Sequence, residues 1–270
     1  MKKLFLSAFA SIIIVSLYAQ DSSSVSQQAP RNKKTDKKDR INNLLRMEEE
    51  GDLIFNKHSI FGIRLASDGY GINYEKGKFK TPTRTVLYEF ELNEKKSPKE
   101  HKQSVSPDDF SYSSIVPYKE NNFYIFKMAM GQQHLIGGKG NKNGVAVTAL
   151  YAGGVSIGML KPYYLDIENK NTQVVTRMTI DQFIADQDPN DYLTGSSGFT
   201  VGWGHLKIKP GLNAKQAMRF DYGRLNSTVS AIEAGLTEEF YFSKIPQVYL
   251  VPQKQFFFNA YVSILFGSRK

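Results

Sequence analysis

From residue 59 onward, the chain alternates between large apolar side chains and small or charged ones with a period of two. This alternation is typical of β-strands, because successive side chains of a strand point to opposite faces. Eight runs of the sequence show it. We therefore predict eight strands, over residues 60–66, 70–76, 85–92, 123–133, 145–160, 214–223, 228–242 and 256–266.

The two faces of each predicted strand differ sharply in composition. Phe61, Ile63 and Leu65, for example, share one face of the first strand, and Arg64 lies on the other. Throughout the chain, the second face carries Gly, Ala, Ser, Thr and ionisable residues of both signs. A secreted β-sandwich would bury its apolar faces in a core, and it remains the alternative. Charges in mid-strand and aromatic residues toward strand ends favour an all-β fold, an eight-stranded antiparallel transmembrane β-barrel. Ile41, Leu44 and Leu45 recur with helical spacing and add a short N-terminal periplasmic helix to this prediction.

The interior of such a barrel would hold ten ionisable side chains. An isolated ion in a dry interior is costly, so we expect these groups to pair with one another. Because the signs are interspersed rather than arranged as a ring of one sign, the pattern favours a structural plug over a narrow selective pore. The predicted lumen charge network consists of Arg64, Glu75, Glu89, Glu91, Lys127, Lys215, Arg219, Asp221, Glu233 and Glu239.

The N-terminal region precedes the alternating pattern. Lys2 and Lys3 followed by an apolar stretch over 4–17 predict a signal peptide over 1–19, and a membrane anchor is the alternative. Residues 20–39 lack aromatic side chains and predict a disordered basic linker, whose cations could also contact anionic lipid or an acidic partner. Residues 40–56 form the predicted periplasmic helix and lead-in, and 57–270 the outer-membrane barrel.

An even number of strands returns both termini to one side, which in bacterial barrels is the periplasm. The segments 77–84, 136–144 and 224–227 are then short periplasmic turns. The longer segments 93–122, 161–213 and 243–255 face outward, together with the tight turn at Asp68-Gly69.

The longest outer segment shows signs of its own structure. The pattern Thr179-x-x-Gln182 is a capping box and predicts a short helix. Residues 195–211 predict an ordered cap, in which Trp203 is more typical of a lipid-interface anchor than of a ligand platform.

Composition narrows the possible chemistry. The chain has 270 residues and no Cys, which excludes disulfides, thiolate metal sites, a Cys nucleophile and lipoprotein acylation. Its formal net charge is +9, but the basic residues are not interleaved with aromatic ones, so no nucleic-acid partner is expected. Mean hydropathy is −0.38, and no apolar run after the leader reaches the ~18 residues of a spanning helix.

Candidate catalytic groups are sparse. The four histidines have no metal-ligand spacing, and there is no G-x-S-x-G motif. A lipid-modifying enzyme would need a hydroxyl activated by histidine, for which His205 with Ser196 or Ser197 is the best candidate. We predict that the protein is not an enzyme and has no cofactor, metal or catalytic residue.

Several sequence segments occur in a fixed order along the chain, among them GIRLASDGYGINYEKG (62–77), MLKPYYLDI (159–167) and IKPGLNAKQAMRFDYG (208–223). With these the chain resembles a Bacteroidota family of small outer-membrane β-barrel proteins of unassigned activity. The resemblance implies an outer-membrane barrel and supplies no catalytic residues.

The last predicted strand also resembles the signal read by the outer-membrane assembly machinery, through Asn259, Ile264 and Phe266. It departs from that signal because Tyr261 stands where Gly is usual, and because four residues follow the final aromatic.

The expected location is the cell outer membrane, with both termini periplasmic. We expect a structural or accessory role in an envelope assembly or secretion complex. The expected partners are outer-membrane lipids, the assembly machinery and a larger envelope complex. A lipid-modifying enzyme and a narrow channel are the alternatives.

Overall fold

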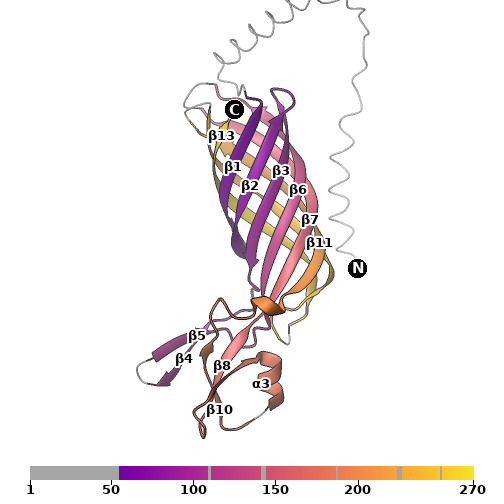
Figure 1. Ribbon diagram of the computed structural model, residues 1–270. Coiled ribbons are helices and arrows are strands. Elements are labelled where there is room, and N and C mark those ends of the chain that lie inside the picture. The colour runs from indigo at the N-terminus through magenta and orange to yellow at the C-terminus, as the bar shows by residue number, and fades with distance from the viewer. Residues whose placement is uncertain (1–54, 109–110, 141–143, 187, 224–226, 250) are drawn as a thin grey trace, which may run out of the picture. The chain divides into compact units, whose positions relative to one another are not determined.

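The computed structural model describes residues 55–108, 111–140, 144–186, 188–223, 227–249 and 251–270. Within these residues, eight antiparallel strands close into a barrel in the order β1-β13-β12-β11-β7-β6-β3-β2 (Figure 1). The prediction of eight antiparallel strands in a barrel is confirmed. The strands are β1 (Lys57–Ala66), β2 (Gly69–Phe79), β3 (Arg84–Lys95), β6 (Asn121–Gly137), β7 (Ala146–Pro162), β11 (Lys207–Asp221), β12 (Thr228–Ile245) and β13 (Lys254–Arg269).

The barrel closes where the first strand pairs with the last. Nine residue pairs join β1 to β13, from His58 opposite Arg269 to Ala66 opposite Tyr261. The backbone amides of Asn56 and Lys57 both donate to the Lys270 carbonyl, at 2.9 and 2.7 Å. Closure gives each of the eight strands a hydrogen-bonded neighbour on both sides, which a spanning structure requires because hydrocarbon offers no hydrogen bonds.

The two ends of the barrel carry different connections. The terminal end is the one at which β1 begins and β13 ends, and it also holds the β2–β3, β6–β7 and β11–β12 turns. The loop end holds the tight β1–β2 turn and the three longer connections, β3–β6, β7–β11 and β12–β13. This division agrees with the one predicted from strand parity.

Strand β11 is longer than predicted, since it begins at Lys207 rather than at residue 214. The predicted outer segment 161–213 and the predicted cap 195–211 both included residues of this strand, and these bounds were wrong. Pro210 and Gly211 resemble a turn in sequence, but β11 pairs with β7 from Lys207 onward and with β12 only from Gly211. Pro210 thus lies where one side of the strand has no partner, and its missing N–H is tolerated there.

Side chains of the barrel strands partition in the reverse sense to those of a soluble protein. Met128, Phe220 and Ile264 are 37%, 39% and 48% exposed on the outer surface, whereas Arg64 and Glu233 are 2% and 0% exposed inside. Large apolar groups therefore face outward around the wall, and ionised groups face the lumen, as in barrels that span membranes.

The loop-end connections form structure that the sequence reading mostly missed. Strands β4 (Gln103–Asp108) and β5 (Ser111–Ile115) make a hairpin. Strands β8 (Tyr164–Asn169), β9 (Val175–Thr179) and β10 (Asp191–Ser196) make a small sheet in the order β10-β8-β9. These strands are only five or six residues long, too short for a clear alternation. The sheet is held by a small apolar core of Leu165, Ile167 and Ile180 with Tyr163, Met178, Phe183, Ile184, Leu193 and Tyr249.

The predicted short helix in this region is confirmed as α3 (Ile180–Asp186). Its start uses one half of the capping box, because the Thr179 amide donates to Gln182 Oε1 at 2.9 Å. A 3-10 turn over Trp203–His205 precedes β11.

The N-terminal predictions fall almost entirely outside the described residues. These are the signal peptide over 1–19, the linker over 20–39 and the periplasmic helix and lead-in over 40–56, of which only residues 55 and 56 are described. Helix α3 lies in a different segment of the chain and is not the predicted N-terminal helix. In the described part of the chain, no helix has both the length and the apolar character needed to cross a membrane.

Candidate functional site: a charge network in the lumen

All ten side chains predicted for the lumen lie inside the barrel, each with at most 5% of its residue surface exposed. Strands β1, β2, β3, β6, β11 and β12 supply them, so the network joins residues far apart in the sequence. The strand alternation explains the arrangement, because every second residue of a barrel strand points to the lumen.

The centre of the network is built on Arg64. Its guanidinium pairs with Glu91, with Glu89 at 3.2 Å and with Glu233 at 3.6 Å. Lys215 joins the same cluster through Glu89 and, at 3.4 Å, through Glu233. The arrangement gives each ion more than one partner of opposite sign, which is how a buried ion is stabilised.

Toward the terminal end, Arg219 clamps two carboxylates. Its two terminal nitrogens donate to Glu75 at 2.9 and 2.6 Å, and Nε and Nη2 donate to Glu233 at 3.0 and 2.6 Å. His58 Nε2 lies 2.7 Å from Glu75 Oε1. The planar guanidinium suits this site, because its donors engage both carboxylates at once.

A further group closes the lumen at the terminal end itself. Asp221 pairs there with Arg269, the last residue of β13, and with Lys139 at 3.4 Å. The side chain of Arg269 also donates to the Thr228 carbonyl at 3.1 Å. The end of the last strand is thereby tied to the network.

Toward the loop end, the network continues through two lysines. Lys127 pairs with Glu239 at 2.6 Å and with Glu91 at 3.3 Å. Lys95 pairs with Glu239 at 3.0 Å and with Asp68 at 2.8 Å. Ion pairs thus extend to the turn between β1 and β2.

Five members of the network were missed in the sequence: His58, Asp68, Lys95, Lys139 and Arg269. All of them lie at or beyond the ends of the predicted strands. A signal for Lys95 was available, since the inward alternation of Glu89 and Glu91 continues through Asn93 to Lys95.

The network is balanced in charge. Among the described lumen residues, seven cations face seven acids, and the imidazole of His58 lies beside Glu75. The cations are Arg64, Lys95, Lys127, Lys139, Lys215, Arg219 and Arg269, and the acids are Asp68, Glu75, Glu89, Glu91, Asp221, Glu233 and Glu239.

The network shares the bore with buried apolar side chains such as Leu87 and Ile125. Two cavities that border it have volumes of about 10 and 20 Å³. A cavity of that size holds about one water molecule. Matched charge and such small cavities beside Arg64 and Arg219 are the arrangement of a plug.

Under the alternative of a lipid-modifying enzyme, the candidate pair was His205 with Ser196 or Ser197, and this pair does not form among the described residues. His205 Nδ1 lies 3.4 Å from the Tyr164 hydroxyl. Ser196 Oγ donates to the Ser114 carbonyl at 3.4 Å, and Ser197 Oγ donates to an Asp166 carboxylate oxygen. Neither serine hydroxyl is therefore activated by His205, as a hydroxyl nucleophile would need.

Trp203 lies in an aromatic cluster beside the outer wall of the barrel. Its ring stacks on Tyr124 of β6 at 5.5 Å, and its Nε1 donates to the Phe199 carbonyl at 2.8 Å. The side chain is 38% exposed. A partly exposed indole on an outward aromatic row fits an interface anchor.

The three residues of the predicted assembly signal lie on β13. Asn259 points inward and is 6% exposed, whereas Ile264 and Phe266 face outward at 48% and 51%. Tyr261, which departs from the usual signal, is buried and donates to Glu233 Oε1 at 2.6 Å. The ring of Tyr261 also lies 4.0 Å below the guanidinium of Arg64, so this residue serves the charge network.

A second polar cluster ties the loop-end connections together. Lys119 pairs with Glu100 at 2.7 Å, and the Glu120 amide donates to the Gln247 carbonyl at 2.9 Å. Partial burial and the nearby negative charge of Asp181 raise the pKa of Glu120. These contacts join the β3–β6 and β12–β13 connections.

No family model and no curated protein matches the chain, so its resemblance to a Bacteroidota family stays an expectation. Solved structures give distant matches to small bacterial barrels. The attachment invasion locus protein Ail of Yersinia pestis has a TM-score of 0.36 and 10% identity, with coverage of 80% of this chain and 100% of that chain. Neisserial surface protein A has a TM-score of 0.38 and 8% identity, with coverage of 79% and 96%.

The N-terminal β-barrel domain of Pseudomonas aeruginosa OprF has a TM-score of 0.33 and 12% identity, with coverage of 79% of this chain and 98% of that chain. With TM-scores below 0.5, these similarities give no information about the function of this chain.

Proposed function

We propose that this protein is a non-enzymatic β-barrel of the bacterial outer membrane, with both termini in the periplasm, and that it serves as a structural or accessory subunit of an envelope assembly or secretion complex. The observation that carries this proposal is the reversed partition of the closed barrel. Apolar side chains such as Phe220 and Ile264 face outward, and a balanced set of ions fills the interior.

The filled lumen supports an accessory role over transport. A channel needs an aqueous path, and the ion pairs of Arg64 and Arg219 cross the space through which such a path would run. The arrangement of Ser196, Ser197 and His205 likewise gives no support to lipid modification.

The loop-end structure supports a role in binding a partner. The β8–β10 sheet and α3 have an apolar core of their own, so they present an ordered surface instead of loose loops. The proposed partners are outer-membrane lipids around the wall, the assembly machinery during insertion, and a larger envelope protein complex at the loops.

The test is purification from native membranes in mild detergent after chemical crosslinking. A matched variant replaces residues 164–196 with a short Gly/Ser linker and leaves the barrel strands intact. We expect the wild-type protein to elute in a larger particle and the variant to elute alone. A folded barrel should resist SDS until boiled in both cases, because its hydrogen bonds form a closed ladder. Elution of the wild-type protein at monomer mass, without a partner, would contradict the accessory role.

A further inference from the structure

Two polar side chains interrupt the apolar outer wall of the barrel. Glu238 of β12 and Gln216 of β11 alternate with buried residues along their strands and therefore point outward. The register places them close together, because Ala214 lies opposite Glu238 and Gln216 lies opposite Leu236 on the neighbouring strand. The two groups thus form one polar spot on the wall.

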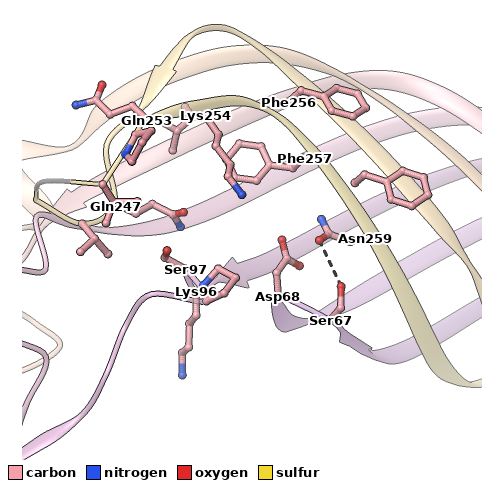
Figure 2. A pocket seen from close by; sticks show the side chains of 16 residues that line it. Ser67, Asp68, Lys96, Ser97, Gln247, Gln253, Lys254, Phe256, Phe257 and Asn259 are labelled. Atoms are coloured by element: carbon pink, nitrogen blue, oxygen red, sulfur yellow. Dashed lines mark hydrogen bonds between the residues drawn. The ribbon is translucent and has the colours of Figure 1, made fainter. Parts of the chain in front are cut away.

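Glu238 lies within the apolar band and not at its rim. Phe240 and Phe242 follow it on the outer face toward the loop end, and Phe256 of β13 lies opposite Phe240. Phe256 and its neighbour Phe257 point apart at the start of β13 (Figure 2), and Phe256 is the one on the outer face, where it is 55% exposed. On a strand tilted by about 40°, the step from Glu238 to Phe242 corresponds to about 10 Å of depth.

Gln216 lies deeper in the same wall. Met218 and Phe220 follow it toward the terminal end, and Leu212 precedes it toward the loop end. These three apolar side chains are 43%, 39% and 48% exposed on the outer surface. The amide is therefore surrounded by lipid-facing residues, at a depth where hydrocarbon offers no hydrogen bond.

Neither polar group has a partner within the described residues. There, no hydrogen bond or ion pair reaches the side chain of Glu238 or of Gln216. Glu94 of β3 differs, because this outward carboxylate lies at the loop end and accepts from the Tyr70 hydroxyl. An ionised group that faces lipid without a partner is unfavourable, so Glu238 calls for a group of opposite charge from outside the chain.

The wall around the two groups is low, because its other outward residues are small. Ala214 and Ala234 are exposed there, and a Cβ added at Gly153 of β7 would meet only the Asn213 carbonyl, at 3.6 Å. Small residues let another backbone approach closely in a membrane. We call these residues together the polar wall patch: Gly153, Ala214, Gln216, Ala234 and Glu238.

We propose that the polar wall patch docks a transmembrane protein partner that presents Lys or Arg to Glu238 and a hydrogen-bonding side chain to Gln216. The inference rests on the outer-membrane placement and accessory role proposed above, and adds a contact surface within the membrane to the one at the loops. The partner's cation neutralises the carboxylate, and its polar side chain gives the amide the hydrogen bonds that lipid cannot supply.

The charge and depth of the patch favour this occupant over two others. A second copy, related by a two-fold axis along the membrane normal, would bring Glu238 toward Glu238 of the other copy, and like charges disfavour that contact. A lipid with an amino headgroup can pair with Glu238. Its hydrocarbon chains would still leave Gln216 without a partner.

The test is photocrosslinking of the full chain in native membranes, with benzoylphenylalanine in place of Leu236, which lies opposite Gln216. The matched control carries the same probe in place of Ile72, an outward residue of β2 that is 45% exposed and lies on the other side of the barrel. We expect an adduct with a different protein from position 236 and none from position 72. Mass spectrometry of that adduct should show Lys or Arg in the crosslinked segment of the partner.

Glu238→Gln tests the charge itself. In the chain probed at position 236, it should lower the yield of the adduct about tenfold or more, because the partner's cation loses its counter-charge. Glu94→Gln removes an outward carboxylate elsewhere and should leave the yield unchanged. In detergent micelles, the isolated Glu238→Gln variant should be at least as stable to urea as the wild type, since its carboxylate has no partner within the described chain.

Four results would overturn the proposal: an adduct with a second copy of this chain, adducts with lipid alone, a partner segment without Lys or Arg, and an unchanged yield in Glu238→Gln. The accessory role is tested separately by elution. A larger particle without an adduct at position 236 would refute the patch and leave that role standing, whereas elution at monomer mass would contradict both.

Discussion

At the scale of single residues, Arg219 shows why each buried charge in the lumen needs a partner of opposite charge. Its guanidinium contacts both Glu75 and Glu233, and all three side chains are almost fully buried. If the cation is removed, two carboxylates remain in the interior without this partner. Because an uncompensated buried charge is strongly unfavourable, the barrel depends on this residue far more than on a surface ion pair.

The change Arg219→Met should lower the free energy of unfolding by about 3–5 kcal/mol, because it breaks a buried pair while leaving the acids in place. Urea-induced unfolding of the refolded protein in detergent micelles measures the effect. Arg177→Met is the matched control, since Arg177 is 64% exposed and lies 3.5 Å from Asp166. It should change stability by about 1 kcal/mol or less. Equal losses in the two variants would contradict the structural importance of the network.

The sequence identified the inward side of the strands but not the pairing within it. Strand alternation predicted that residues such as Glu89, Arg219 and Glu233 share the lumen, and the barrel places them there. Which of them touch depends on the stagger between strands, which opposes Arg219 to Glu233 across β11 and β12. No local pattern encodes that register. The ion pair between Arg219 and Glu75 could not be predicted from the sequence either, because Glu75 lies on β2, which is not adjacent to β11.

At the scale of elements, long barrel strands were predictable and short loop strands were not. A barrel strand shows its alternation over many residues, whereas β8 and β9 have six and five residues and gain their order from a shared apolar core. The start of α3 was readable because a capping box is a local signature that needs no distant partner.

Helix α3 should depend on that capping contact. The change Gln182→Ala removes the acceptor of the Thr179 amide, which leaves a donor at the start of the helix without its partner. We expect faster hydrogen exchange over residues 180–186 in the variant, with the barrel strands unchanged. Hydrogen-exchange mass spectrometry measures both regions in one experiment. The exposed change Gln253→Ala, in the β12–β13 connection, is the control and should leave exchange in α3 as it is. Unaltered exchange in α3 of the Gln182→Ala variant would contradict this role.

At the scale of the whole molecule, the balanced network should make the barrel a poor conductor. The ion pairs of Arg64 and Arg219 cross the bore, and the two cavities of about 10 and 20 Å³ beside them are too small for a hydrated ion. In planar bilayers we expect no unitary conductance from the purified protein, with its heat-dependent gel shift as the control for folding. Stable, reproducible conductance steps would show that the network opens and would favour the channel alternative.

The orientation of the barrel wall toward lipid is the central claim, and spin-label accessibility tests it most directly. The chain has no Cys, so Phe220→Cys, Ile264→Cys and Val175→Cys each place one label on a known site. In liposomes, labels at 220 and 264 should collide frequently with oxygen and rarely with a water-soluble nickel complex. The label at 175, on the exposed strand β9, should show the reverse. If labels at 220 and 264 were as accessible to the nickel complex as the label at 175, or shielded from both reagents, the outer wall would not face hydrocarbon and the membrane account would be wrong.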